Sequence, residues 1–139
     1  MAEKKREGRK KKMVCFDTDF LVAYIRKDPA AKCKLEELES TQEPLHTTII
    51  NAFELYKGAY KSKDSNTELA RVDKLLDAFF LLALDRDSAK AAGALNDKSN
   101  PIGESDLLIA SIVLANKQVL ITRNKKHFER ISGLKVEDW

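Results

Sequence analysis

The first apolar run of the chain reads Met13-Val14-Cys15-Phe16-Asp17-Thr18-Asp19 and stops abruptly at two carboxylates. A short, continuous apolar run that is closed by polar residues is typical of a buried strand. We therefore predict a strand over Val14–Asp17, followed by a helix over Phe20–Arg26 with Asp19 as its N-cap. If Asp19 caps this helix, Asp17 has no structural role at the end of the strand and its carboxylate is available for chemistry.

Later segments of the chain repeat this pattern. A second apolar run, Val119-Leu120-Ile121-Thr122-Arg123-Asn124, also ends in polar residues. Asp106 lies in the first turn of a predicted helix over Glu104–Asn116, which is apolar nearly all round and is therefore expected to be buried. Glu54 interrupts another apolar helical stretch. The candidate site residues are Asp17, Glu54, Asp106, Thr122 and Asn124.

The whole chain alternates short apolar runs with helical stretches of about ten residues, which favours an α/β sandwich around a mostly parallel sheet. In such sheets, ligands bind outside the carboxyl ends of the strands. The polar residues that end two strands are therefore expected on one rim, with Asp106 facing the same edge. The remaining predicted strands are Leu45–Thr47, Phe80–Leu84 and an edge strand within Gly133–Trp139. The remaining predicted helices are Pro29–Glu39, Ile49–Tyr60, Thr67–Asp77, a helix capped by Asp87 or Ser88 that ends near Leu95, and Lys125–Arg130.

The predicted helix Ile49–Tyr60 begins after Thr48, which is a suitable N-cap. Its apolar residues recur at helical spacing, which predicts a buried stripe. The polar stretch Asn96–Gly103 is expected to be a loop. The apolar stripe of Ile49–Tyr60 consists of Ile49, Ala52, Phe53, Tyr56, Ala59 and Tyr60.

The composition fits one soluble globular domain, since the chain has 139 residues of which 43% are hydrophobic and 34% charged. No apolar run approaches the roughly 18 residues that cross a bilayer, and no signal-peptide pattern follows the basic start. We expect a cytoplasmic protein without membrane association. Residues 1–12 carry seven Lys or Arg and two Glu, a net charge of +5, against +3 for the whole chain. This basic leader is expected to be disordered, either as an arm that attracts nucleic acid or without a role.

Each candidate residue also has an ordinary structural explanation. Asp17 could form a turn or a helix cap, and Asp106 could stabilise its helix through the macrodipole. Glu54 could be exposed and pair with Lys57. Asn124 could cap the short helix that follows it. No single residue is specific, and only the combination points to a site.

The combination of acidic residues points to a divalent cation. Three carboxylates within a few ångströms of one another repel and raise one another's pKa unless a cation intervenes. Hard oxygen ligands select Mg²⁺ or Mn²⁺. Zinc is disfavoured because the two histidines, His46 and His127, are far apart and no cysteine lies at ligand spacing. A water bound to such a cation can be activated to attack a phosphodiester.

The sequence resembles the PIN-domain ribonucleases and, within them, the VapC-type toxins of toxin–antitoxin pairs. The order and spacing of the matching motifs hold from Met13 to Trp139, which leaves only the basic leader outside the resemblance. Taken together the motifs are specific, although each alone is weak. The matching stretches are Val14–Asp19, Asn51–Leu55, Ile102–Ala110 and Leu120–Phe128.

This resemblance implies a PIN-like three-layer α/β/α sandwich over residues 13–139, and endonucleolytic cleavage of RNA that depends on Mg²⁺ or Mn²⁺. By position, Asp17, Glu54 and Asp106 match the family carboxylates that surround the metal. Asn124 falls where many members carry a fourth Asp and others an Asn. Thr122 matches a hydroxyl that often joins the site. The resemblance also implies a homodimer and inhibition by a small antitoxin protein.

The resulting hypothesis is an endoribonuclease in which a metal-activated water hydrolyses RNA phosphodiesters and leaves a 5′-phosphate. Arg123, Lys125 and Lys126 could steer the RNA backbone toward the site. One alternative is a phosphohydrolase that resembles the haloacid dehalogenases, with Asp17 as its covalent nucleophile, although a matching Lys motif and acid pair are missing. The other is a non-catalytic PIN scaffold that only binds RNA or protein.

Overall fold

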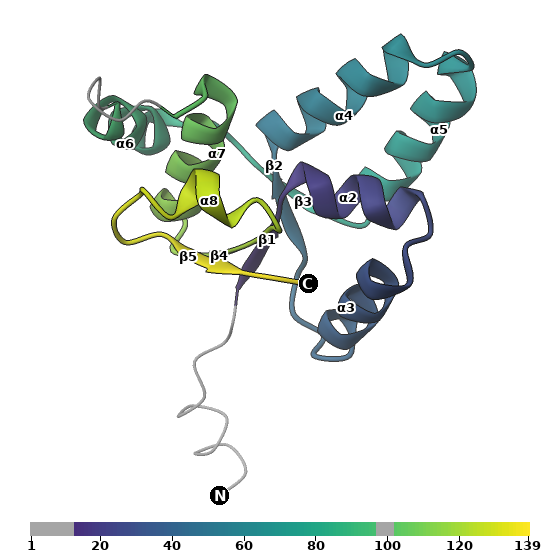
Figure 1. Cartoon of the computed structure of the whole chain (residues 1–139), viewed down its shortest axis with the longest axis horizontal. Helices are drawn as coiled ribbons and strands as arrows, with labels where there is room; N and C mark the ends of the chain where they lie inside the picture. Colours follow the sequence, from purple (N-terminus) through teal and green to yellow (C-terminus); the bar gives the residue numbers. More distant parts are fainter. Residues whose placement is uncertain (1–12, 97–101) are drawn as a thin grey trace, which may run out of the picture.

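The computed structural model describes residues 13–96 and 102–139, which form a central sheet covered by helices on both faces (Figure 1). All five strands of the sheet are parallel, in the order β3-β2-β1-β4-β5. The predicted α/β fold with a mostly parallel sheet is therefore confirmed. The strands are β1 (Val14–Phe16), β2 (His46–Thr48), β3 (Phe80–Leu82), β4 (Val119–Ile121) and β5 (Lys135–Glu137).

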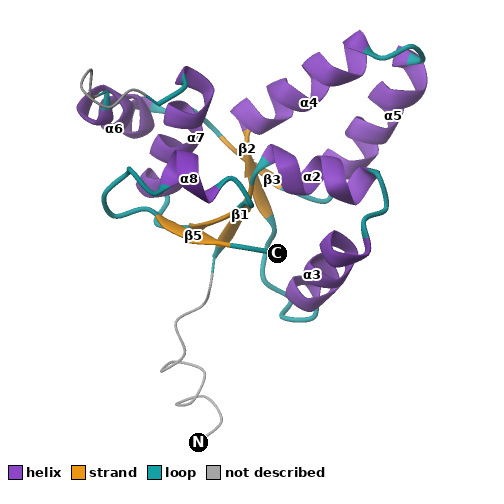
Figure 2. Cartoon of the chain, in the orientation of Figure 1, coloured by secondary structure: helices purple, strands orange, loops and turns teal. Residues whose placement is uncertain are grey.

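The helices divide into two groups on either side of the strands, as the purple and orange ribbons of Figure 2 show. The group α2 to α5 packs on one face of the sheet, and α7 with α8 packs on the other, with α6 beside α7. The described helices are α2 (Thr18–Ile25), α3 (Pro29–Glu39), α4 (Ile49–Lys61), α5 (Ser65–Leu76), α6 (Arg86–Leu95), α7 (Glu104–Ala115) and α8 (Lys125–Phe128).

Alternation along the central strands explains why the sheet has an apolar core on each face. In β1, Val14 and Phe16 belong to the core under α2 to α5, whereas Cys15 belongs to the core under α7 and α8. In β4, Ile121 and Leu120 divide in the same way. Such strands are apolar on both faces, as expected for a parallel sheet covered on both sides.

The register of the two central strands brings their carboxyl ends together. Phe16 of β1 lies opposite Ile121 of β4, and the backbone N–H of Asp17 donates to the carbonyl of Ile121 at 3.0 Å. Asp17 and Thr122 therefore leave the sheet side by side. This is the shared rim that the sequence predicts from the ends of its apolar runs.

Three local predictions need correction. The apolar stripe expected on α4 is only partly buried: Ala52 and Ala59 are buried, whereas Phe53 is 58% exposed and Ile49 and Tyr60 are also exposed. The polar Asn51 is buried in their place. The N-cap of α6 is Asp85, not Asp87 or Ser88, because Asp85 Oδ1 accepts from the backbone of Ser88. The third concerns Asp17 and Asp19 and is described with the site. The predicted disordered leader over residues 1–12 and most of the predicted loop Asn96–Gly103 lie outside the described residues.

Candidate active site

An acidic cleft of about 430 Å³ opens at the carboxyl ends of the central strands. Asp17 and Thr18 reach it from the end of β1, Glu54 from α4 and Asp106 from the first turn of α7. The segment after β4 supplies the remaining wall. Of the five predicted site residues, four line the cleft and Thr122 lies directly behind them. The lining residues are Asp17, Thr18, Asp19, Glu54, Asp106, Arg123 and Asn124.

Asp17 is the most restrained carboxylate of the cleft and is only 6% exposed. One oxygen, Oδ1, accepts from the backbone N–H of Thr18 at 2.9 Å and from Asn51 Nδ2 at 3.0 Å. The other, Oδ2, accepts from the hydroxyl of Thr122 at 2.7 Å. These donors come from three separate elements, and they fix the orientation of the carboxylate before any ligand binds.

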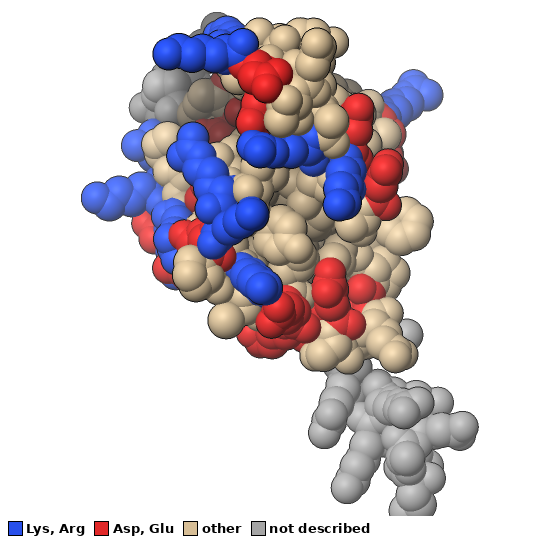
Figure 3. Space-filling view, turned by 90° about the vertical axis from the view of Figure 1, so that its right-hand side faces the viewer, with Lys and Arg blue, Asp and Glu red and all other residues tan. Residues whose placement is uncertain are grey.

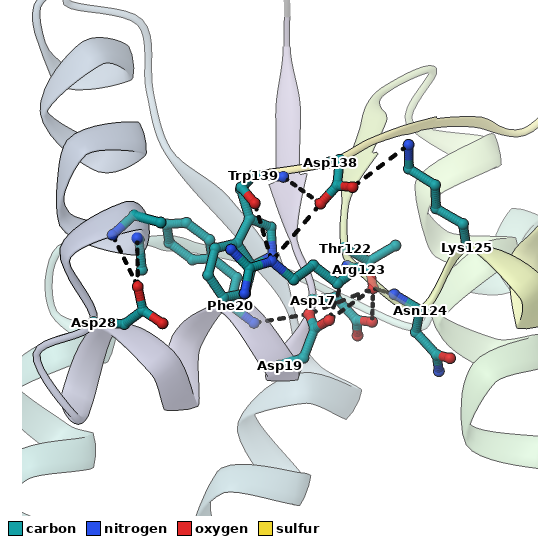
Figure 4. Close-up of polar contacts among 12 residues, drawn as sticks. Asp17, Asp19, Phe20, Asp28, Thr122, Arg123, Asn124, Lys125, Asp138 and Trp139 are labelled. Atoms are coloured by element: carbon teal, nitrogen blue, oxygen red, sulfur yellow. Dashed lines mark hydrogen bonds and ion pairs between the residues drawn. The ribbon is translucent and has the colours of Figure 1, made fainter.

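Asp17 is also the N-cap of α2, so the prediction that Asp19 caps this helix is wrong. Helix α2 begins one residue after β1, at Thr18, and the chain has no room for a separate cap. Asp19 instead lines the cleft and accepts from the backbone N–H of Arg123 at 2.9 Å, which ties α2 to the segment after β4 (Figure 4). The carboxylate of Asp19 thus belongs to the candidate site.

The pKa of Asp17 is raised to about 6, and burial is the largest cause. The neighbouring charges of Asp19 and Asp106 contribute to this rise, whereas the hydrogen bonds from Thr122 and from the Thr18 backbone oppose it. Crowded acidic groups around a buried carboxylate are the electrostatic arrangement expected at a cation site. A strongly perturbed pKa in a cleft also marks a functional-site candidate.

Glu54 and Asp106 are half-buried, and each is held by a neighbouring side chain on the cleft wall. The hydroxyl of Thr18 donates to Glu54 Oε1 at 2.7 Å. Asp106 Oδ2 lies 2.9 Å from His127 Nδ1. Both carboxylates lie on helices of the scaffold, α4 and α7, so their backbones are fixed while their side chains can still turn toward a ligand.

His127 connects Asp106 to Asn124, because its Nδ1 also lies 2.8 Å from the Asn124 side-chain amide. The amide atom in this contact is Nδ2, a donor. Nδ1 therefore accepts from Asn124 in one tautomer and donates to Asp106 in the other, so the tautomer of His127 decides which of the two contacts is a hydrogen bond. The side chain of Asn124 does not cap α8. The amide therefore takes part in the site rather than in the helix end.

Asn51 supports the site, but the sequence analysis did not predict it as a site residue. It is fully buried, and its Nδ2 donates to both Asp17 Oδ1 and the hydroxyl of Thr18. Its Oδ1 accepts from Thr48, which completes a capping box at the start of α4. The spacing Thr48-x-x-Asn51 is a sequence signal for that cap, but nothing in it indicates the contact with Asp17.

The donor set fits a hard divalent cation in its chemistry, because every acidic group of the cleft offers carboxylate oxygens. The fit in position is incomplete. Among residues 13–96 and 102–139, no three acidic, histidine or cysteine side chains converge closely enough to hold a metal ion as they lie. Glu54 and Asp106 are turned toward Thr18 and His127, so cation binding requires these two side chains to reorient.

Comparison with known proteins assigns the chain to a family. A family model for the PIN domain matches residues 14–134. The sequence is 31% identical over 127 residues to ribonuclease VapC2 of Rickettsia felis, a match that covers 88% of this chain and 95% of that protein. The chain belongs to the PIN-domain family of VapC-type ribonucleases. It is also 27% identical over 127 residues to the tRNA(fMet)-specific endonuclease VapC of Shigella flexneri, with the same coverage.

The fold of this PIN domain agrees with solved VapBC structures. VapBC2 from Rickettsia felis, crystallised with a DNA fragment from its promoter, contains a chain that matches with a TM-score of 0.82 and 29% identity, covering 91% of this chain and 98% of that one. DNA-bound VapBC from Salmonella typhimurium contains a chain that matches with the same TM-score, 28% identity and coverage of 93% and 99%. The resemblance to VapC-type ribonucleases is thereby confirmed, and the haloacid dehalogenase and non-catalytic alternatives are set aside.

Proposed function

We propose that this chain is an endoribonuclease that depends on a divalent cation, Mg²⁺ or Mn²⁺, and acts as the toxin of a VapBC-type toxin–antitoxin pair. The observation that carries the proposal is the acidic cleft, in which the carboxylates of Asp19, Glu54 and Asp106 line the same cleft as Asp17, whose pKa is raised. Such crowding is costly without a cation, and a phosphodiester is the substrate that a hard cation activates well.

The residues of the cleft have distinct roles in this proposal. Asp17, Glu54 and Asp106 would hold the cation, directly or through water, and Asp17 is already oriented for this by its three hydrogen bonds. Thr122 and Asn124 complete the site, the first by fixing Asp17 and the second through its amide. When bound, the cation supplies a water of lowered pKa and neutralises charge on the phosphate. Hydrolysis breaks the bond to the 3′ oxygen and leaves a 5′-phosphate.

Cleavage of a mixed RNA pool tests this proposal. The wild type is expected to cut RNA with Mg²⁺ or Mn²⁺ and to stop in excess chelator, and Asp17→Asn and Asp106→Asn are expected to be inactive. Glu104→Gln is the matched control, because Glu104 shares the first turn of α7 with Asp106 but does not line the cleft. Activity that survives both Asn substitutions, or that persists in chelator, contradicts the mechanism.

The proposed antitoxin has a suitable surface on the far side of α2. There the helices α2, α3 and α5 form a groove with an apolar floor that includes Ile25, Leu35 and Phe79. Lysine and arginine side chains gather on this face of the molecule (Figure 3), and Lys32 and Lys74 are among those that line the groove. An amphipathic segment with acidic flanks fits such a surface. Co-purification with the product of a small neighbouring gene, and its loss when the exposed groove residues are reversed in charge by Lys32→Glu and Lys74→Glu, would support this assignment.

The proposed homodimer would bury exposed apolar side chains. Ile49, Phe53 and Tyr60 lie exposed along α4, and Phe80 and Leu81 lie exposed on the edge strand β3. Exposed apolar groups that gather on neighbouring elements are typical of an interface. In residues 13–96 and 102–139, no helix is both long and apolar enough to cross a membrane. We place the active protein in the cytoplasm, where RNA and a co-expressed antitoxin are available.

A further inference from the structure

Arg123 is the one basic side chain among the described residues that line the acidic cleft. A flexible arginine at this position would be expected to form a bidentate pair with one of the carboxylates. Within the described part of the chain its guanidinium makes no such pair. Only its backbone N–H reaches a cleft residue, by donating to Asp19. Something else holds the guanidinium away from the acids.

The holding contacts come from residues 138 and 139, which follow β5. The guanidinium of Arg123 stacks on the Trp139 ring, with its central carbon 3.5 Å from the ring centroid. Its Nε donates to the Trp139 carbonyl at 3.0 Å and lies 3.8 Å from Asp138 Oδ1. Figure 4 shows the Arg123 side chain lying across Trp139, beside Asp138.

The platform under Arg123 is itself anchored in the core. The Trp139 ring packs edge-on against Phe20, with ring centroids 5.3 Å apart, and Phe20 is fully buried. Asp138 also lies 3.7 Å from Lys125 Nζ, which limits its own movement. The position of the guanidinium is therefore set by packing rather than by the charges of the cleft.

These contacts use only Nε and one face of the guanidinium. The two terminal nitrogens, Nη1 and Nη2, have no partner among the described residues and form the fork that binds phosphate in two parallel hydrogen bonds. We propose that Arg123 binds a phosphate of the RNA at the edge of the acidic cleft, and that Trp139 is the positioning residue that presents it. This inference rests on the proposed ribonuclease function.

The arrangement separates two charges that would otherwise cancel. Held against Trp139, Arg123 leaves the carboxylates of the cleft available for a cation and keeps its own charge for the substrate. Stacking on an aromatic face is also the contact in which arginine and lysine differ most. A lysine at this position would keep the charge but would lose the fork and the Nε bond.

The experiment measures binding of a short, fluorescein-labelled, mixed-sequence single-stranded RNA by anisotropy, in chelator so that the full-length protein does not cut it. Arg123→Gln is expected to weaken binding about tenfold and to reduce the salt dependence by about one phosphate contact. The affinity of Arg123→Lys for RNA should fall between those of the wild type and Arg123→Gln. Lys90→Gln is the matched control, because it removes the same charge from an exposed position on α6 that does not line the cleft.

A double-mutant cycle tests the positioning role of Trp139 separately from its role in packing. Trp139→Leu keeps apolar contact with Phe20 but loses the stack, and it is expected to weaken RNA binding nearly as much as Arg123→Gln. Trp139→Phe is expected to restore most of the affinity. In the Arg123→Gln background, Trp139→Leu should add little further loss, although it lowers the melting temperature equally in both backgrounds.

Two outcomes overturn the inference. One is an Arg123→Gln variant that binds RNA as tightly, and with the same salt dependence, as the wild type. The other is an undiminished effect of Trp139→Leu on binding in the Arg123→Gln background. Failure of the ribonuclease proposal is distinguishable, because it appears as a wild type that does not cut RNA with Mg²⁺ or Mn²⁺.

Discussion

Replacing Asp17 with Asn is expected to stabilise the metal-free protein while it abolishes cleavage. The pKa of Asp17 is raised from 3.8 to about 6, mainly by burial, so the folded protein favours the neutral carboxyl group. In the unfolded chain the same group ionises freely above pH 3.8. The folded state is therefore progressively destabilised as the pH rises from 3.8 through about 6, and the loss is complete above that range.

The magnitude follows from the pKa difference. At 1.36 kcal/mol for each pH unit, the shift corresponds to a ceiling of about 3 kcal/mol at neutral pH. An Asn at position 17 keeps one acceptor oxygen, but its NH₂ group replaces the other and meets groups that donated to Asp17. The hydrogen bonds lost in this way cost about 1–2 kcal/mol. We expect a net gain of about 1–2 kcal/mol, or a rise of about 3–6 °C in the melting temperature.

Thermal and urea unfolding in chelator, followed by circular dichroism, measure this gain at several pH values. The advantage of Asp17→Asn should be large near pH 7.5 and should shrink toward pH 4.5, because the wild-type carboxyl group becomes protonated there. Added Mn²⁺ should stabilise the wild type more than the variant. Asp64→Asn is the control, since hydrogen bonds from Thr67 lower the pKa of Asp64 and its replacement should destabilise at neutral pH.

The reasoning is refuted if Asp17→Asn is less stable than the wild type near pH 7.5 without metal. It is also refuted if the difference in stability between the two proteins does not change with pH. Either result would mean that ionised Asp17 costs the folded protein little free energy. The crowding of carboxylates around Asp17 would then no longer support the inference that a cation binds there.

Three further perturbations test the scaffold of the site. Thr122→Val removes the hydroxyl that donates to buried Asp17 and should lower the free energy of unfolding by about 1–3 kcal/mol. Thr122→Ser keeps a hydroxyl, so it should cost less stability and keep activity. Urea denaturation together with an RNA cleavage assay distinguishes the two variants. Asn51→Ala removes the side chain that donates to Asp17 and Thr18 and that completes the capping box of α4. We expect the free energy of unfolding to fall by about 2–4 kcal/mol and RNA cleavage to be impaired. A variant that is as stable and as active as the wild type would contradict the role given to Asn51. Phe53→Ser should convert the dimer into a monomer, as measured by light scattering, without lowering the melting temperature of the monomer, because the Phe53 side chain is exposed in the single chain. Lys61→Ser is the control for this variant. A wild type that is monomeric would contradict the proposed interface.

The periodicity of the sequence determines much of the fold because each signal is local. Short apolar runs that end in polar residues give β1 and β4, and Asp28-Pro29 gives the start of α3, where the Asp28 side chain caps the helix. The parallel sheet follows from the alternation of strands and helices. The prediction of the buried stripe on α4 failed in part, because this helix carries apolar residues on two faces. The sequence of α4 alone does not indicate which of the two faces meets the sheet.

The sequence also indicated three of the four carboxylates of the cleft, Asp17, Glu54 and Asp106, because carboxylates within or beside apolar runs are visible without coordinates. The pairing of β1 with β4 decided that Asp17 and Thr122 share a hydrogen bond across 105 residues of chain. Tertiary structure alone showed that Asp17 rather than Asp19 caps α2, that Asn51 supports the site, and that Trp139 holds Arg123. Contacts of this kind depend on packing between distant elements, and no local pattern encodes which side chains meet there.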